Sequence, residues 1–137
     1  MSTLFTIFRA KRQLLATLAV LAGISAVGLE AAQWLPFDGS AFKKAQTEGK
    51  TVVIDFHATW CPTCAAQRPV LEKLIGESEF KNVVAFVADF DSSSEIKKQM
   101  KVASQSTIVV FKGNREVARS TGVTNEDDLR TLLKKGL

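Results

Sequence analysis

The sequence predicts an α/β domain with a central mixed sheet of about four strands flanked by helices. Short runs of apolar and β-branched residues alternate with segments whose apolar residues recur at helical spacing. This alternation favours parallel pairing in the middle of the sheet, and Gly113-Asn114 between the last two runs favours an antiparallel hairpin. The chain of 137 residues is long enough for one domain with its own hydrophobic core.

The expected domain begins with a short segment and a helix. Residues 34–39 are interpreted as a linker or a short first strand. Residues 40–48 predict a helix, because Asp38 or Ser40 can cap its N-terminus and Gly49 can end it.

The next strand and helix enclose both cysteines of the chain. Residues 51–58 form a continuous apolar and β-branched run, which is typical of a strand buried on both faces. Residues 62–75 predict a helix, in which Pro62 suits the first position and Pro69 is expected to cause a kink. One face of this helix is marked by residues at spacings of four, three and four, namely Cys64, Arg68, Leu71 and Ile75.

The second half completes the order α-β-α-β-α-β-β-α. Residues 82–90 predict an apolar strand, residues 93–101 a polar helix and residues 106–120 the hairpin. Residues 124–135 predict a final helix with Thr124 as its N-cap, since acidic residues fill the first turn and lysines the last.

Residues 1–32 precede the expected domain at 33–137 and are typical of a signal peptide or a membrane anchor. Three basic residues at positions 9–12 are followed by an uncharged run and then by small residues. The apolar part of the run extends about 24 Å as a helix, short of a roughly 30 Å membrane core, which favours a cleaved signal. A retained anchor and an ordinary helix are the alternatives. We therefore expect export to the periplasm, either free or membrane-anchored facing it, where disulfides persist.

The charge pattern argues against a nucleic-acid partner. The net charge is +4, but the basic residues are scattered beside acidic ones and do not form a cluster interleaved with aromatics. The sequence also contains no glycine-rich phosphate loop and only one histidine, which leaves little scope for a Ser/His/Asp set. The only membrane contact we expect is through the N-terminal segment.

The segment DFHATWCPTC contains Cys61, Cys64 and the sole histidine, His57. A structural zinc site needs four ligands, more than these three residues supply. A disulfide between two such close residues closes too short a loop to stabilise the domain much. A redox pair is therefore the favoured interpretation, and we expect no metal and no dissociable cofactor.

The position of the two cysteines between a strand and a helix strengthens this interpretation. Unpaired backbone N–H groups and the positive end of the helix dipole would point at the Cys61 sulfur and favour its thiolate. Cys64 follows one turn later, where it can resolve a mixed disulfide.

The segment Asp55–Cys64, with Pro69 after it, resembles the active-site segment of the thioredoxin family, and the likeness extends from about Phe37 to the C-terminus. The resemblance implies a thioredoxin fold and thiol–disulfide exchange on protein disulfides, with another thiol protein as the redox partner. It implies that Cys61 is the attacking cysteine and Cys64 the resolving one.

The resemblance also implies roles for residues around the cysteines. Asp55 corresponds to a buried acid whose raised pKa would let it exchange a proton with Cys64. His57 is interpreted as a partly exposed strand residue, or alternatively as a group that tunes Cys61. The expected substrate-binding residues are Trp60, Pro62, Thr63, Gln105 and Ser106.

The sequence departs from the family pattern at two of its positions. Ser106 stands where the family usually has a cis-proline, and a cis bond before a non-proline residue costs about 3 kcal/mol. Either Gln105–Ser106 is therefore a strained cis bond, or the loop runs differently. Val87 stands where many thioredoxins have a lysine, so Asp55 is expected to be hard to ionise and to favour its protonated form at neutral pH.

The sequence leaves the direction of the redox reaction open. The expected buried Asp55 and the position of Trp60 favour a reductase of exported proteins. An oxidase or isomerase of the same fold is one alternative. A non-catalytic thiol module that binds a metal or a partner is another, because Ser106 and His57 beside the cysteines could open a ligand site.

Overall fold

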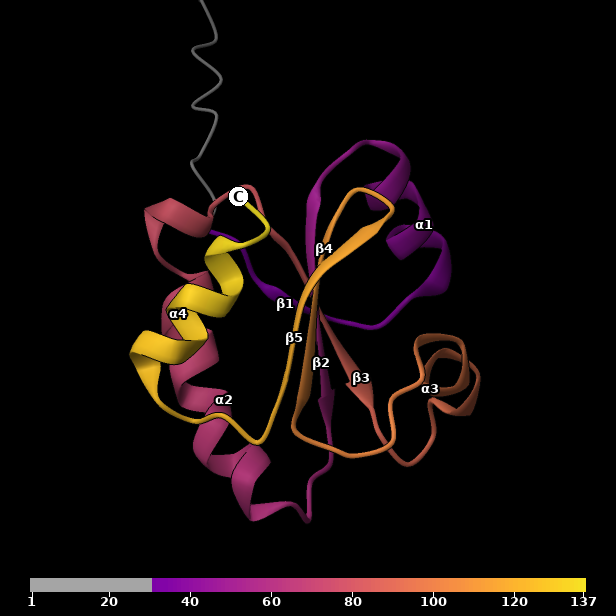
Figure 1. Ribbon diagram of the computed structural model, residues 1–137, viewed down its shortest axis with the longest axis vertical. Helices are drawn as coiled ribbons and strands as arrows, with labels where there is room; N and C mark the ends of the chain where they lie inside the picture. Colours follow the sequence, from indigo (N-terminus) through magenta and orange to yellow (C-terminus); the bar gives the residue numbers. More distant parts are fainter. Residues whose placement is uncertain (1–30) are drawn as a thin grey trace, which may run out of the picture.

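The computed structural model describes residues 31–137, which form a five-stranded mixed sheet with helices on both faces (Figure 1). The order of strands across the sheet is β1-β3-β2-β4-β5. The predicted α/β class and mixed sheet are confirmed. No helix within residues 31–137 is long and apolar enough to span a membrane. The predicted signal or anchor at residues 1–32 lies outside the described residues, except for its last two positions.

The two halves of the sheet differ in strand direction. β1 (Trp34–Pro36) and β2 (Thr51–His57) each pair in parallel with β3 (Val84–Asp89). β4 (Thr107–Lys112) pairs antiparallel with β2 and with β5 (Arg115–Thr121), which forms the predicted hairpin. The segment interpreted as a linker or short strand is therefore an edge strand, which makes five strands where about four were expected.

Two layers of helices cover the sheet, one on each face. α1 (Gly39–Thr47) and α3 (Ser94–Met100) lie on one face, and α2 (Pro62–Ile75) and α4 (Glu126–Lys134) lie on the other (Figure 1). A short 3-10 helix, η1 (Ser78–Phe80), follows α2 and was not predicted. It buries Phe80 in the core on the α2 side.

Alternate residues of β2 explain how one strand serves both layers. Ile54 and Phe56 pack with residues of α1 and α3, whereas Val53 packs with residues of α2 and α4. Successive side chains of a strand point to opposite faces, and both faces are covered here, so most of the strand is apolar. Asp55 lies on the same face as Val53, which is the face covered by α2.

The helix caps follow the predicted chemistry with one correction. Asp38 caps α1 by accepting a hydrogen bond of 2.7 Å from the backbone N–H of Ala41, which decides between the two predicted caps. The N-cap of α4 is Asn125 and not Thr124, so that prediction is wrong. The Asn125 side chain accepts hydrogen bonds from the backbone N–H groups of Asp127 and Asp128, at 2.9 and 3.2 Å. This geometry stabilises the start of a helix. The helical run of α2 continues through Pro69.

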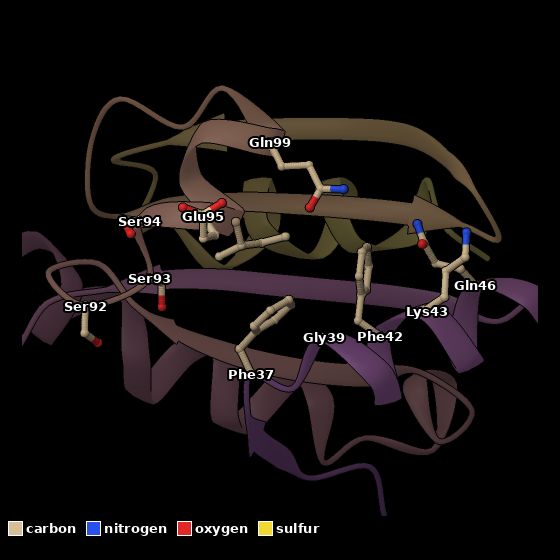
Figure 2. Close-up of a pocket in the computed structure, with 11 residues that line it drawn as sticks. Phe37, Gly39, Phe42, Lys43, Gln46, Ser92, Ser93, Ser94, Glu95 and Gln99 are labelled. Carbon is tan, nitrogen blue, oxygen red and sulfur yellow. The ribbon is translucent and has the colours of Figure 1, made fainter.

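A cavity of about 450 Å³ opens between α1 and α3 (Figure 2). Its apolar part is formed by Phe37, Phe42 and Ile96, and polar side chains such as Gln99 stand at its rim. None of the predicted site residues lines it. The two cysteines lie elsewhere, where β2 leads into α2.

Candidate active site

Cys61 occupies the N-cap position of α2 and has an extended backbone. Its sulfur accepts a hydrogen bond of 3.1 Å from the backbone N–H of Cys64. Pro62 takes the first helical position, where a missing N–H has no cost. The chain thus brings the positive end of the α2 dipole to the Cys61 sulfur, as the sequence predicts.

Ser106 lies against both cysteines. Its hydroxyl is 3.2 Å from the Cys61 sulfur and 3.2 Å from the Cys64 sulfur, within hydrogen-bond distance of each. Both cysteines are reduced and almost covered, with exposed fractions of 2% for Cys61 and 1% for Cys64. Phe90 and Ala58 pack around them. Two thiols and a hydroxyl therefore share one small apolar enclosure.

The two thiols differ in acidity. Burial alone would raise the pKa of the Cys61 thiol, but hydrogen bonds from Cys64, Ser106 and the backbone N–H groups of Cys64 and Thr63 lower it below its ordinary value. Burial raises the pKa of Cys64, and the hydrogen bond to Cys61 raises it further. Cys61 is therefore the more readily ionised thiol, which is the property required of an attacking cysteine.

The backbone at Ser106 departs from what a proline could adopt. Its φ is +59°, in the left-handed region, whereas proline is restricted to about −65°. Its N–H donates to the carbonyl of Phe56 at 2.9 Å, and its carbonyl accepts from Gly122 at 3.0 Å. The Ser106 backbone therefore has a conformation that proline could not adopt at this position.

Gln67 is a site residue that sequence reasoning missed. It lies in α2 and is buried, and its side-chain amide donates to the carbonyl of Val123 at 2.7 Å and to that of Ser106 at 3.4 Å. It thus ties α2 to the two loops beside the cysteines. A polar residue on the buried side of the helix is the signal that could have revealed it.

Asp55 is buried in β2 with an exposed fraction of 1%. Its neighbours on the flanking strands are Val87 and Ile108, which are both apolar. Burial raises the pKa of Asp55 to about 6, although the charges of His57 and Arg68 act in the opposite direction. The direction predicted from Val87 is confirmed.

The predicted protonated state of Asp55 at neutral pH is wrong. A carboxyl group with a pKa of about 6 is roughly nine-tenths ionised at pH 7. The reason is Arg68, whose Nη1 lies 3.6 Å from the Asp55 Oδ2, together with the His57 Nδ1 at 3.9 Å. Within residues 31–137, Asp55 forms no hydrogen bond with either cysteine. Proton exchange with Cys64 therefore remains a prediction.

The sequence identified Arg68 only as one of the residues that mark one face of α2, together with Cys64, Leu71 and Ile75. A charged residue at an inward-facing helical position was the available signal that it has a buried partner. The partly exposed position predicted for His57 is confirmed, because it is half-buried at the end of β2.

The remaining predicted site residues differ in how far they are exposed. Trp60 is 60% exposed, and its indole N–H donates to the Asp91 carboxylate at 2.8 Å. Pro62 is exposed, whereas Thr63 and Gln105 are half-buried. Their role in binding substrate stays a prediction. Among residues 31–137, no group of three or more His, Cys, Asp or Glu side chains is arranged to hold a metal ion.

A reduced pair of thiols at a helix N-terminus, one acidified and the other not, is the apparatus of a thiol–disulfide oxidoreductase. Comparison with known proteins agrees with this class. The family model described as Thioredoxin matches residues 34–135. The chain belongs to the thioredoxin family and is a thiol–disulfide oxidoreductase.

Individual relatives cover most of the described residues. A thioredoxin of Chlamydia trachomatis is 40% identical over 84 residues, which span 61% of this chain and 80% of that protein. A thioredoxin of Coprinus comatus is 32% identical over 96 residues, which span 70% of this chain and 90% of that protein. The crystal structure of Trxlp from Edwardsiella tarda is similar with a TM-score of 0.72 at 32% identity, and covers 74% of this chain and 98% of that one.

Proposed function

We propose that this protein is exported and reduces or exchanges disulfides of other exported proteins. The Cys61 thiolate attacks one sulfur of a substrate disulfide, and the other substrate sulfur leaves as a thiolate. Cys64 then loses its proton and attacks the Cys61 sulfur, which releases the second substrate thiolate. The substrate gains two electrons, and the Cys61–Cys64 pair becomes a disulfide. A second thiol protein restores the reduced pair.

The observation that carries this proposal is the difference in acidity between the two thiols. The pKa of Cys61 is lowered by the hydrogen bonds at the start of α2, whereas burial raises the pKa of Cys64. The more acidic thiol, Cys61, is ionised first and attacks the substrate disulfide. Cys64 stays protonated until the second step, in which it resolves the mixed disulfide.

The proposal of export rests on the sequence of residues 1–32. Its support is the positive start, the uncharged run and the small residues that follow. The cleaved signal and the retained anchor both place the domain on the far side of the membrane. N-terminal sequencing of the protein recovered from a periplasmic fraction distinguishes them, and recovery of the full chain from the cytosol would contradict export.

Covalent capture tests the proposed substrates. The Cys64→Ser variant lacks the resolving thiol, so substrates should remain attached to Cys61 as mixed disulfides. The matched control is the Cys61→Ser variant, which should capture far less because it lacks the attacking thiol. Captured partners that are exported proteins support the proposal, and mainly cytosolic partners would contradict it.

A disulfide oxidase is the second candidate, and one observation favours it. The Ser106 hydroxyl contacts both reduced sulfurs at 3.2 Å, and hydrogen bonds to the reduced form raise the reduction potential. Equilibration with glutathione decides between the two. A reduction potential above about −150 mV would assign the protein as an oxidant, and a lower value would support the reductase.

A further inference from the structure

A cluster of unpartnered polar atoms surrounds Asp55, between β2 and α2. Within residues 31–137, four buried side-chain atoms have no hydrogen-bond partner, and three of them belong to Asp55, His57 and Arg68. The fourth belongs to Gln67, the residue that precedes Arg68 in α2. Buried polar atoms without partners are costly, so a cluster of them calls for an explanation.

Three contacts fix the orientation of Arg68. Its Nε donates to the Glu72 carboxylate at 2.8 Å, one turn further along α2. Its guanidinium carbon lies 4.9 Å from the ring centre of Trp34, within the range of a cation–π contact. Its Nη1 approaches the Asp55 Oδ2 to 3.6 Å. Only 24% of the Arg68 side chain is exposed, so water screens its charge incompletely.

Among residues 31–137, Arg68 is the one permanently charged side chain placed against Asp55 by the elements packed around it. From β2 the facing group is His57, at 3.9 Å, which is charged only when protonated. From β3 and β4 the flanking residues are Val87 and Ile108, which carry no charge. An arginine keeps its positive charge at every pH at which proteins remain folded.

We propose that Arg68, held by Trp34 and Glu72, is the positioning residue that keeps the Asp55 carboxylate ionised as the proton acceptor of the resolving step. In that step Asp55 takes the proton of the Cys64 thiol, the Cys64 sulfur bonds to the Cys61 sulfur, and the substrate sulfur leaves with the electron pair of the broken bond. This role rests on the proposed function, because it presupposes that Cys64 resolves a mixed disulfide.

The test is a carbon-detected NMR titration of the Asp55 carboxyl in the reduced full-length chain. Arg68→Gln should raise the Asp55 pKa by about one unit, since an opposite charge within 4–6 Å lowers a carboxyl pKa by that order. Arg68→Lys keeps a charge and should preserve at least half of the effect. Arg119→Gln is the matched control, because Arg119 pairs with Glu116 and contacts the end of α3, across the sheet from α2.

A kinetic measurement extends the test to the reaction. The pH midpoint of the resolving step, followed from a preformed mixed disulfide on Cys61, should move upward with the Asp55 titration in Arg68→Gln. The same substitution in an Asp55→Asn background should leave the pH profile unchanged.

Three results would overturn the inference. The first is an Asp55 titration that is the same in Arg68→Gln as in the unaltered chain, and the second is an equal shift in Arg119→Gln. The third is a shift in Asp55 without a shift in the resolving step. If Arg68→Gln does not fold, Arg68→Met, which also removes the charge but keeps an unbranched apolar side chain, replaces it, and the same results decide for or against the role. Failure of the unaltered protein to reduce any disulfide would instead contradict the proposed function.

Discussion

The hydroxyl of Ser106 lies 3.2 Å from the sulfur of Cys61, at a position where the thioredoxin resemblance leads one to expect a proline. A proline ring offers no donor, whereas a hydroxyl can donate a hydrogen bond to a thiolate. The reduced, ionised form of Cys61 is stabilised by this contact more than the disulfide is, because a charged sulfur is the better acceptor.

Replacing Ser106 by Ala should therefore make Cys61 less acidic and the protein a stronger reductant. We expect the pKa of Cys61 to rise and the reduction potential to fall by roughly 10–30 mV, which corresponds to one ordinary hydrogen bond. Thiolate absorbance and equilibration with glutathione measure the two quantities. Ser104→Ala is the control, since the Ser104 hydroxyl contacts Gln105 and neither cysteine. An unchanged or raised potential in Ser106→Ala would contradict the account.

Replacing Ser106 by Pro should destabilise the protein. The left-handed φ of +59° is closed to proline, and the N–H that Ser106 donates to Phe56 would be lost. We expect the free energy of unfolding in urea to fall by roughly 2 kcal/mol or more. Ser106→Gly, which tolerates this φ, should be much less destabilising. A proline variant as stable as the unaltered protein would show that the loop adopts another conformation.

The buried Asp55 should make the folded protein less stable as the pH rises. Its pKa is raised to about 6 by burial, so between about pH 4 and pH 6 the folded state holds a proton that the unfolded state has lost. The free energy of unfolding should therefore fall through this range by about 3 kcal/mol at most, and then stay level.

Surface carboxylates such as Glu77 have the opposite effect on the pH dependence. The hydrogen bond with Arg130 lowers the pKa of Glu77, so its contribution to the free energy of unfolding grows as the pH rises. The difference between the unaltered protein and Asp55→Asn isolates the buried group. Urea unfolding should find Asp55→Asn more stable at pH 7, with a smaller advantage at pH 4. An equal difference at both pH values would show that Asp55 does not titrate in this range.

Trp60 should contribute to substrate binding and little to stability. It is 60% exposed beside Cys61, and its only side-chain hydrogen bond in the described residues goes to the exposed Asp91. Trp60→Ala should raise the KM for a protein disulfide several-fold and change the free energy of unfolding by about 0.5 kcal/mol or less. Leu35→Ala, at another exposed apolar residue on the β1 edge, is the control. An equal KM in both variants would show that Trp60 does not contribute to substrate binding.

Most of the fold could be predicted because its signals are local. The continuous apolar run of β2 and the capping residues of the helices lie within a few residues of the elements that they define. β1 could not be assigned with the same certainty, because three residues carry no usable periodicity and only their pairing with Ala85 to Val87 makes them a strand. The N-cap of α4 was misplaced by one residue, since Thr124 and Asn125 are both good caps.

The residues of the candidate site also fall into those that local sequence reveals and those whose partners are distant in sequence. Cys61 and Cys64 could be recognised from their position between a strand and a helix. Gln67 and Arg68 could not, because their partners are distant in sequence: Ser106 and Val123 for Gln67, and Asp55 for Arg68. The ionised state of Asp55 was mispredicted for the same reason, since its counter-charge comes from α2 and not from the neighbouring strand.

The most direct test of the account is a titration of both thiols in the reduced full-length protein, followed by NMR of the cysteine Cβ carbons so that neither cysteine has to be replaced. The account predicts that the pKa of Cys61 lies below that of an ordinary cysteine and that the pKa of Cys64 lies above it. A Cys61 pKa above that of an ordinary cysteine, or a Cys64 thiol that ionises first, would contradict it.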